Sequence, residues 1–119
     1  MVSGRGARTK GHDAERAAVR YLRECGYQLA TTSRAAAGRD GFAQETDIIG
    51  VPGVALEVKN RRDLQIGSAL TQATIAGGPG KIPVVFAKPI GVGMDDVGRW
   101  WAMTWVSEMV QLFPKWGEL

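Results

Sequence analysis

The sequence predicts an α/β domain with a mixed central sheet flanked by helices, in the order α-β-β-β-α-β-β-α. Three patterns support this prediction. Apolar residues recur at helical spacing over 12–25. Two apolar runs flank Val51-Pro52-Gly53-Val54, as the strands of a hairpin flank a turn. Residues 82–87 form a short apolar run, which is typical of a buried strand.

Length and composition are those of an ordinary globular protein. The 119 residues suit one domain better than two, and we expect a flexible basic arm at 1–10 followed by a single domain at 11–119. No apolar run approaches the roughly 20 residues that span a bilayer. The N-terminus lacks the apolar stretch of a signal peptide. We therefore expect a cytoplasmic protein.

Single copies of cysteine and histidine restrict the possible chemistry. One cysteine excludes an intrachain disulfide and a zinc site built from thiolates. Cys25 ends the apolar stripe of the first helix, so we expect its thiol to be buried. His12 cannot by itself supply a histidine-rich site, and we expect it to cap the helix or to face solvent. Any metal ion would then be held by oxygen ligands, which favours Mg²⁺, with Mn²⁺ as a substitute.

Charge is distributed unevenly along the chain. Residues 1–39 carry eight basic and three acidic side chains, a net charge of +5, whereas the remainder carries seven basic and nine acidic side chains, a net charge of −2. Arg16, Arg20 and Arg23 are spaced to form one basic face of the first helix. A basic N-terminal third beside an acidic site suits a polyanion held at its backbone. The alternative is an ordinary solvated surface.

The boundaries of the elements follow from apolar runs and the residues that interrupt them. The stripe of the first helix consists of Ala14, Ala17, Ala18, Tyr21, Leu22 and Cys25. Thr9 or Asp13 is expected to cap its start, and Gly26 suits the position after its end. We predict strands at 27–32, 45–51, 54–60, 82–87 and 100–104, further helices at 67–76 and 105–113, a small-residue loop at 33–44 and a turn at 91–99.

Capping residues are also predicted for the later helices. Ser68 is expected to cap the helix at 67–76, which Gly77-Gly78 should end, and Thr104 is expected to cap the last helix. Residues 77–81 resemble a phosphate loop, but they follow a helix, and Lys81 is followed by Ile instead of Ser or Thr. We interpret this segment as a connection between a helix and a strand.

Acidic and basic side chains meet at the predicted hairpin. Asp47 begins the incoming strand, and the outgoing strand places Glu57 and Lys59 on one face and Val58 on the other. The apolar neighbours of Glu57 imply burial, and a buried charge needs a partner. Two carboxylates and one ammonium group suit a divalent metal ion and a phosphate. The alternatives are a surface ion pair for Glu57 and Lys59 and a turn or edge role for Asp47.

The register of the hairpin tests this interpretation. With Pro52-Gly53 as a two-residue turn, Ile48 would face Glu57, and Asp47 would point to the opposite side of the sheet. A shared metal site therefore requires one extra residue between Asp47 and Glu57, as a bulge or as a three-residue loop. We predict that irregularity.

The pattern resembles the PD-(D/E)xK nuclease superfamily. The resemblance covers about 11–105 and rests on the order of elements, Glu15 in the first helix, Asp47, and Glu57-Val58-Lys59. Within the superfamily, size and layout are similar to the Holliday-junction resolvases of archaea and bacteriophages. Thr46 departs from the proline that is common there. Ser33-Arg34-Ala35 departs from the Ser-Gly of the archaeal enzymes. The resemblance implies a restriction-endonuclease-like core.

The resemblance also implies a function. It implies a Mg²⁺-dependent DNA endonuclease that hydrolyses phosphodiester bonds, foremost a resolvase of four-way junctions. The metal ligands would be Asp47, Glu57 and the backbone carbonyl of Val58. Lys59 would neutralise the developing negative charge or orient the attacking water. Glu15 could bind a second metal ion or a water in the metal's shell.

Other residues are expected to support such a site. Gln72, on the helix after the hairpin, could hydrogen-bond the same water network. DNA contacts are expected from Arg5, Arg8, Lys10, Arg16, Arg20, Ser33, Arg34, Arg61 and Arg62. Symmetric resolution needs two cuts, so a homodimer follows if the substrate is a four-way junction. The interface expected for it is the C-terminal segment that contains Trp100, Trp101, Trp105 and Trp116, for which core packing and base stacking are alternatives.

Two other functions remain open at this point. A nicking, mismatch or restriction-type endonuclease would share the fold and the catalytic residues but not the substrate. A DNA-binding module without catalysis would share only the basic surface. Cleavage of four-way junctions and of linear duplex distinguishes the first of these, and loss of cleavage on substitution of the acids distinguishes the second.

Overall fold

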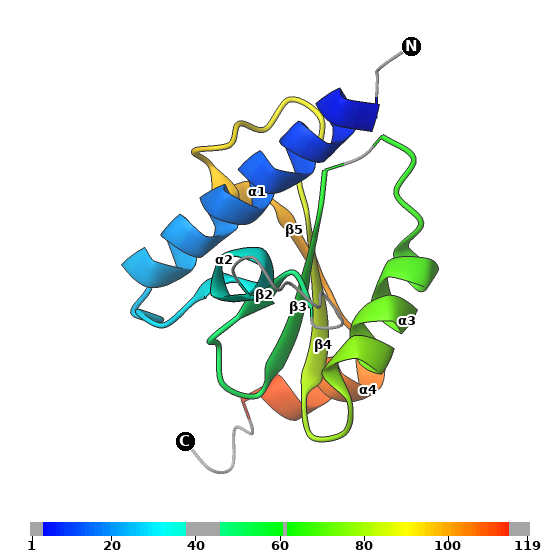
Figure 1. The fold of residues 1–119 in the computed structure, drawn as a ribbon. Helices are drawn as coiled ribbons and strands as arrows, with labels where there is room; N and C mark the ends of the chain where they lie inside the picture. The colour runs from blue at the N-terminus through cyan, green and yellow to red at the C-terminus, as the bar shows by residue number, and fades with distance from the viewer. Residues whose placement is uncertain (1–3, 38–45, 61, 115–119) are drawn as a thin grey trace.

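The computed structural model describes residues 4–37, 46–60 and 62–114 (Figure 1). It is an α/β fold with a five-stranded mixed sheet in the strand order β1-β2-β3-β4-β5. The elements are α1 (Gly4–Glu24), β1 (Thr31–Thr32), α2 (Ser33–Ala37), β2 (Ile48–Ile49), β3 (Val54–Lys59), α3 (Ile66–Gly77), β4 (Ile82–Ala87), η2 (Val97–Arg99), β5 (Trp101–Met103), α4 (Val106–Met109) and η3 (Val110–Leu112). The predicted order is confirmed, with α2 added between β1 and β2. Within the described ranges, no helix is long and apolar enough to cross a membrane.

The strand directions place one end of β3 beside one end of β4. The pairs β1–β2, β2–β3 and β4–β5 are antiparallel, whereas β3 and β4 are parallel and are joined by α3. A parallel pair needs such a crossover. The carboxyl ends of β3 and β4 therefore lie together, and the Lys88 N–H donates to the Lys59 carbonyl at 3.0 Å. Lys88 thus begins the chain segment that lies beside the end of β3.

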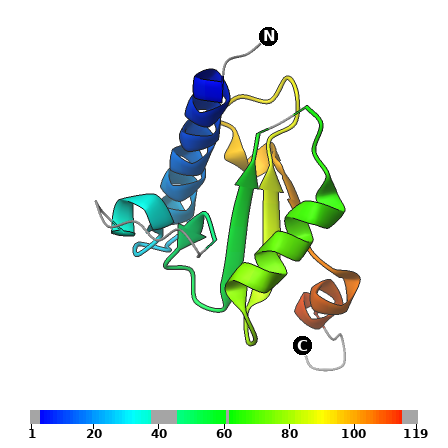
Figure 2. The same ribbon diagram turned by 45° about the vertical axis from the view of Figure 1, so that its right-hand side comes forward.

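α1 and α3 lie on opposite faces of the sheet (Figure 2), and an apolar layer holds each of them there. α1 packs its small residues, among them Ala14 and Ala18, against Leu56 and Val58 of β3. On the other face, Leu70 of α3 packs with residues of β4 and β5, which include Val85 and Met103. Successive residues of a strand point to opposite faces. The even-numbered residues 56 and 58 of β3 therefore face α1, and the odd-numbered residues 57 and 59 are on the side of α3.

The first helix differs from its prediction at both ends. α1 begins at Gly4, so residues 4–10 are helical instead of forming a separate arm, and neither Thr9 nor Asp13 caps its start. The helix starts this early because Gly6 and Gly11, which lie among better helix formers, do not interrupt it. The prediction of a buried Cys25 is wrong, because the thiol is exposed. Cys25 follows the end of α1, which projects past the short β1 (Figure 1).

The segment after α1 also differs from its prediction. Of the strand predicted at 27–32, only Thr31–Thr32 pairs, because the chain first turns back onto the helix through the Tyr27 N–H, which donates to the Leu22 carbonyl. The loop predicted from residue 33 begins instead with α2. The Thr32 hydroxyl accepts a hydrogen bond from the Ala35 N–H at 3.1 Å and caps this helix. Residues 38–45 lie outside the described residues.

The later elements follow their predictions more closely. β4 has the predicted bounds, and Gly78, with φ +69°, ends α3 as expected. Residues 77–81 connect α3 to β4, as interpreted from the sequence. α3 begins at Ile66 with no side-chain cap, so the prediction for Ser68 is wrong. Thr104 does not cap the last helix either, because its hydroxyl donates to the Pro83 carbonyl. The last helix is shorter than predicted and continues as η3.

Candidate active site

The hairpin of β2 and β3 has the predicted irregularity. Ile48 pairs with Leu56, and the same register continued places Gly50 opposite Val54, with residues 51–53 as a three-residue loop. The Val54 N–H donates to the Val51 carbonyl at 3.2 Å across this loop. Continued in the other direction, the register sets residue 47 opposite residue 57. The carboxylates of Asp47 and Glu57 can therefore meet, as a shared site requires.

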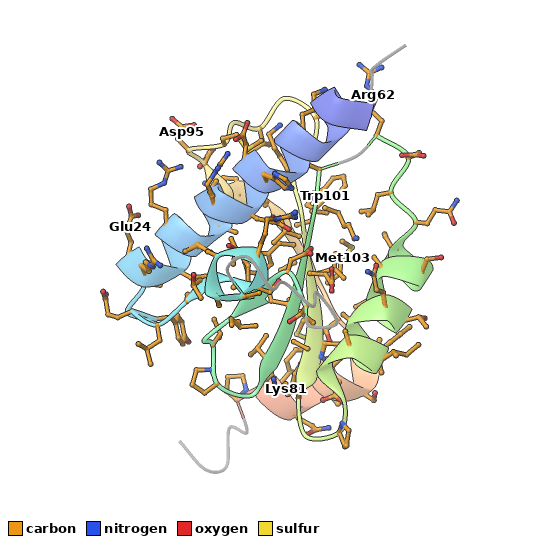
Figure 3. The ribbon with its side chains drawn as sticks, viewed as in Figure 1. Glu24, Arg62, Lys81, Asp95, Trp101 and Met103 are labelled. Atoms are coloured by element: carbon orange, nitrogen blue, oxygen red, sulfur yellow. The ribbon has the colours of Figure 1, made fainter. Side chains whose placement is uncertain are left out.

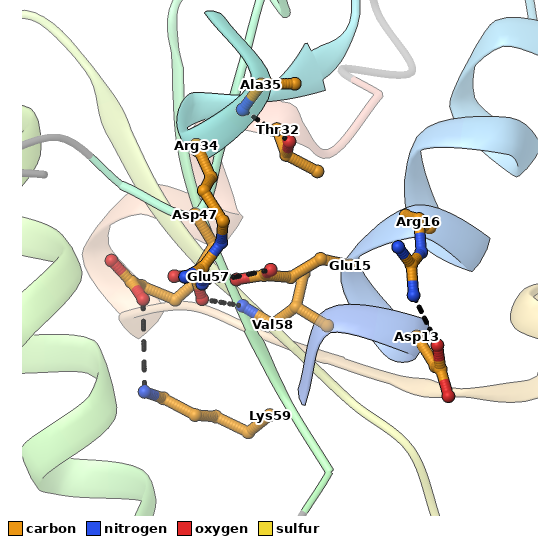
Figure 4. Close-up of polar contacts among 10 residues, drawn as sticks. All are labelled: Asp13, Glu15, Arg16, Thr32, Arg34, Ala35, Asp47, Glu57, Val58 and Lys59. Atoms are coloured by element: carbon orange, nitrogen blue, oxygen red, sulfur yellow. Dashed lines mark hydrogen bonds and ion pairs between the residues drawn. The ribbon is translucent and has the colours of Figure 1, made fainter. Parts of the chain in front are cut away.

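Asp47 lies where the ladder between β2 and β3 stops. The Val58 N–H donates to Asp47 Oδ2 at 2.9 Å (Figure 4). The Ser33 N–H donates to the Asp47 carbonyl at 2.9 Å. Thr46 is buried beside it, and its hydroxyl donates to the Ile48 carbonyl. Neighbouring segments on both sides thus fix Asp47. Because the N–H and C=O of one strand residue point to the same side, the Val58 carbonyl is directed to the side of Asp47.

Glu57 is a buried acid with an unsatisfied oxygen. Only 2% of the residue is exposed, and its Oε2 atom has no hydrogen-bond partner in the described part of the chain. The Lys59 ammonium lies 3.9 Å from Oε2, close enough for an ion pair only (Figure 4). Burial, and then the hydrogen bond and the charge of Asp47, raise the pKa of Glu57 to about 8, which Lys59 opposes. A positive charge at Oε2 would relieve this cost.

Glu15 adds a third carboxyl from the opposite side of the sheet. It lies on α1 and is 7% exposed. Burial and the charge of Asp47 raise the pKa of Glu15 to about 7, and Arg34, 3.7 Å from Glu15 Oε2, acts in the opposite direction. The charge of Asp47 raises the pKa of both glutamates, so the three carboxyls form one electrostatic group. These three residues are called the acid cluster below.

Gln72, the residue predicted to support the site, also lies there. Lys59 Nζ donates to Gln72 Oε1 at 3.4 Å, a long hydrogen bond that joins the end of β3 to α3. Lys59 is only half-buried, so its ammonium group is accessible from solvent. The structure therefore brings together all five residues that the sequence assigned to catalysis.

An open cleft of about 1000 Å³ lies beside the acid cluster. Acidic residues on its surface are Glu15, Asp47 and Asp63, and the basic or potentially basic residues are Lys10, His12, Arg34, Lys59, Arg62 and Lys88. Such a cleft suits a phosphate backbone that passes a negatively charged centre. Sequence reasoning did not include His12, Asn60 or Lys88 in the site. Lys88 could have been found from the rule that the carboxyl ends of parallel strands share an edge.

The predicted DNA contacts divide into several groups. Lys10, Arg34 and Arg62 line the cleft. Arg16 and Arg20 are exposed on α1 but do not line it, and Arg16 forms an ion pair with Asp13 at 2.6 Å. Ser33 contributes a backbone contact to Asp47. Arg5 and Arg8 lie on the first turns of α1, where side chains are not described, and Arg61 lies outside the described residues.

The donor atoms fit a divalent cation that prefers oxygen. Two carboxylates, Asp47 and Glu57, meet beside the carbonyl of Val58, and one carboxylate oxygen is buried without a hydrogen-bond partner. No group of three or more His, Cys, Asp or Glu side chains in the described ranges could by itself hold a metal ion. The candidate ligand set therefore consists of two carboxylates, a backbone carbonyl and solvent or substrate oxygens.

Known proteins add no assignment to this geometry. Comparisons with protein-family models, with curated proteins and with solved structures found no match for the chain. Function is therefore inferred from the residues of the site.

Proposed function

We propose that the protein is a Mg²⁺-dependent DNA endonuclease of the PD-(D/E)xK type, with a restriction-endonuclease-like core and four-way junctions as its substrate. The observation that carries this proposal is the meeting of Asp47, Glu57 and Lys59 at the end of β3, where Glu57 Oε2 has no hydrogen-bond partner among the described residues. Buried charges without partners are costly and are retained where chemistry needs them. The basic cleft beside them supports a polyanionic substrate.

Each residue has a role that follows from its position. Asp47, Glu57 and the Val58 carbonyl would hold Mg²⁺, which when bound withdraws charge from a phosphate and lowers the pKa of water. Lys59 places its ammonium group beside Glu57, where it can bind a phosphate oxygen as negative charge develops. Gln72 accepts a hydrogen bond from that ammonium group and so orients it.

Glu15 is suited to proton transfer as well as to a second metal ion. Its pKa, raised to about 7, allows the carboxyl to hold or release a proton near neutral pH. Its position on α1 places it across Asp47 from Glu57. The basic residues of the cleft, among them Arg34 and Lys88, would bind phosphates on either side of the cut.

The proposal is tested with Asp47→Asn. Asparagine retains an oxygen that can accept the Val58 N–H but removes the charge, so we expect cleavage of a synthetic four-way junction to fall by at least ~10³-fold. We also expect Mg²⁺ to raise the Tm of the unmodified protein but not that of Asp47→Asn. A gel assay of labelled strands measures cleavage, and a thermal unfolding scan with and without Mg²⁺ measures the Tm.

Asp95→Asn is the matched control, since Asp95 is exposed and does not line the cleft. Cleavage that survives Asp47→Asn would contradict the site. Linear duplex cut as fast as the junction would favour a nicking or restriction-type enzyme. Junction binding without cleavage in Mg²⁺ or Mn²⁺ would favour a DNA-binding module.

A junction substrate also implies a homodimer, and the C-terminal surface supports one. Several large apolar residues of α4, η3 and their flanks are exposed: Trp105, Val106, Met109, Val110, Leu112 and Phe113. Exposed large apolar residues gathered on one segment of the chain indicate an interaction site. Two copies paired through a two-fold axis would present two acid clusters to two opposed strands.

The dimer is tested with Val106→Asp, because Val106 is 78% exposed and the substitution leaves the core intact. We expect the unmodified protein to sediment as a dimer at micromolar concentration and Val106→Asp to sediment as a monomer. Leu29→Asp is the control, because Leu29 is 82% exposed and distant in sequence from α4, and this variant should remain dimeric. A monomeric unmodified protein would contradict the interface.

A further inference from the structure

Trp101 lies in the same row of the sheet as Lys59. Lys59 of β3 pairs with Ala87 of β4, and Ala87 pairs with Trp101 of β5. Neighbouring strands lie about 4.8 Å apart, so the backbones of Lys59 and Trp101 are separated by roughly 10 Å. Ala87, which is buried, lies between them in this row. Trp101 is therefore within one nucleotide's reach of the proposed phosphate site.

Trp101 also lies on the same face of the sheet as Lys59. Its neighbours settle this, because Trp100 belongs to the core under α1 and Met103 packs in the core under α3. Strand residues alternate between faces, so Trp101 shares the face of Met103. In Figure 3, Trp101 lies closer than Met103 to the end of the molecule where Arg62 lies, and Lys81 marks the opposite end.

The indole of Trp101 does not contribute mainly to the core. The residue is 58% exposed, whereas the adjacent Trp100 is 8% exposed and donates its ring N–H to the Gly93 carbonyl. The exposed apolar residues of α4 follow β5 at its other end, because β5 runs antiparallel to β4 and Thr104 contacts Pro83 at the start of β4. Trp101 thus lies away from the proposed dimer surface and at the same end of the sheet as Lys59.

We propose that Trp101 stacks on an unpaired base next to the phosphate bound at Lys59, and that it thereby directs the enzyme to branch points and single-stranded segments. The inference rests on the proposed nuclease function, because it takes Lys59 as the phosphate site. Exposed aromatic side chains near basic residues bind the bases of single strands, and Trp101 is exposed two strands away from Lys59, which lines the basic cleft. In continuous duplex each base is already stacked, and its extrusion costs free energy that an unpaired base does not require.

The test measures binding without Mg²⁺, so that cleavage plays no part. The probes are a four-way junction and a forked duplex, each with 2-aminopurine at an unpaired or branch-point position, and a continuous duplex of the same sequence. We expect Trp101→Ala to bind the junction and the fork about 5- to 100-fold more weakly, with duplex affinity unchanged. Trp101→Phe should recover most of the affinity and the quenching of 2-aminopurine fluorescence.

Tyr27→Ala is the matched control, since Tyr27 is 45% exposed and lies after the far end of α1. With Mg²⁺, Trp101→Ala should raise KM for the junction and leave kcat within about threefold, as expected for a residue that binds away from the reacting atoms. Equal loss of affinity for all three probes, or a change in sedimentation, would overturn the stacking role in favour of a structural or subunit contact.

The outcomes separate this inference from the proposed function. Normal junction cleavage by a Trp101→Ala protein with unchanged KM and fluorescence would overturn the stacking role and leave the nuclease intact. Base-dependent binding through Trp101 in a protein that never cleaves DNA would overturn the nuclease and retain the stacking contact.

Discussion

Replacing Glu57 with glutamine is expected to abolish Mg²⁺-dependent cleavage and, at the same time, to stabilise the metal-free protein above neutral pH. Glutamine has nearly the same shape but lacks the charge that would hold the cation, so we expect a loss of at least ~10³-fold in kcat. The gain in stability has the same origin. The charged carboxylate is buried, and its Oε2 atom has no hydrogen-bond partner among the described residues.

The direction of the pH dependence follows from the raised pKa of Glu57. The pKa is about 8 in the folded protein and 4.5 ordinarily, so folding favours the protonated carboxyl. Stability from this group is fully present below about pH 4.5 and is lost as pH rises through 8. The pKa of Glu15, raised to about 7, acts in the same direction. Urea unfolding in EDTA measures the free energy of unfolding at pH 5 and at pH 9. Between these two pH values, we expect it to fall by a few kcal/mol less in Glu57→Gln than in the unmodified protein.

Glu24→Gln is the control for this measurement, because Glu24 is an exposed acid at the end of the same helix as Glu15. It should follow the unmodified protein at both pH values. Mg²⁺ at pH 8 should raise the Tm of the unmodified protein and of Glu24→Gln, but not of Glu57→Gln. A Glu57→Gln protein that is less stable at pH 9, or that still cleaves DNA, would contradict a metal-binding role for this carboxylate.

Replacing Lys59 with methionine is expected to lower kcat for junction cleavage by about 10²- to 10³-fold. Methionine retains the apolar stem of the half-buried side chain and removes the ammonium group that lies beside Glu57 and Gln72. Because Lys59 is not a proposed metal ligand, the rise in Tm with Mg²⁺ should persist. Single-turnover cleavage at saturating junction, measured beside the thermal scan, separates these two effects.

Lys88→Met is the matched control, since Lys88 lines the same cleft and follows the adjacent strand. A phosphate contact should affect KM and reduce the salt dependence of binding by about one counterion, with kcat little changed. If Lys88→Met and Lys59→Met lost the same fraction of kcat, the role of Lys59 would be that of a general positive charge and not of a catalytic residue.

The parts of the site that could be predicted from sequence are those set by short-range geometry. The alternation of β3 places Glu57 and Lys59 on one face, and pairing arithmetic for a shared site predicts one extra residue between Asp47 and Glu57, which the structure supplies as a three-residue loop at 51–53. Gln72 is predicted to support the site because it lies on the helix after the hairpin, and in the structure it contacts Lys59.

The parts that could not be predicted depend on where the chain is covered in three dimensions. Cys25 continues the apolar stripe of the helix, yet its thiol is exposed, because periodicity alone does not show which turns of a helix are covered. Lys88 and His12 join the cleft only through strand order and helix placement. Trp100 and Trp101 are the same residue type in consecutive positions, and only the sheet decides which one is buried.

The hydrogen bond between the Val58 N–H and Asp47 Oδ2 has a consequence for spectroscopy. A backbone amide that donates to a carboxylate is sensitive to the charge on that carboxylate. The fold has therefore placed an NMR-visible proton one hydrogen bond away from the acid cluster. Its chemical shift, followed through a Mg²⁺ or pH titration, observes the site directly and requires neither substrate nor label at a catalytic residue.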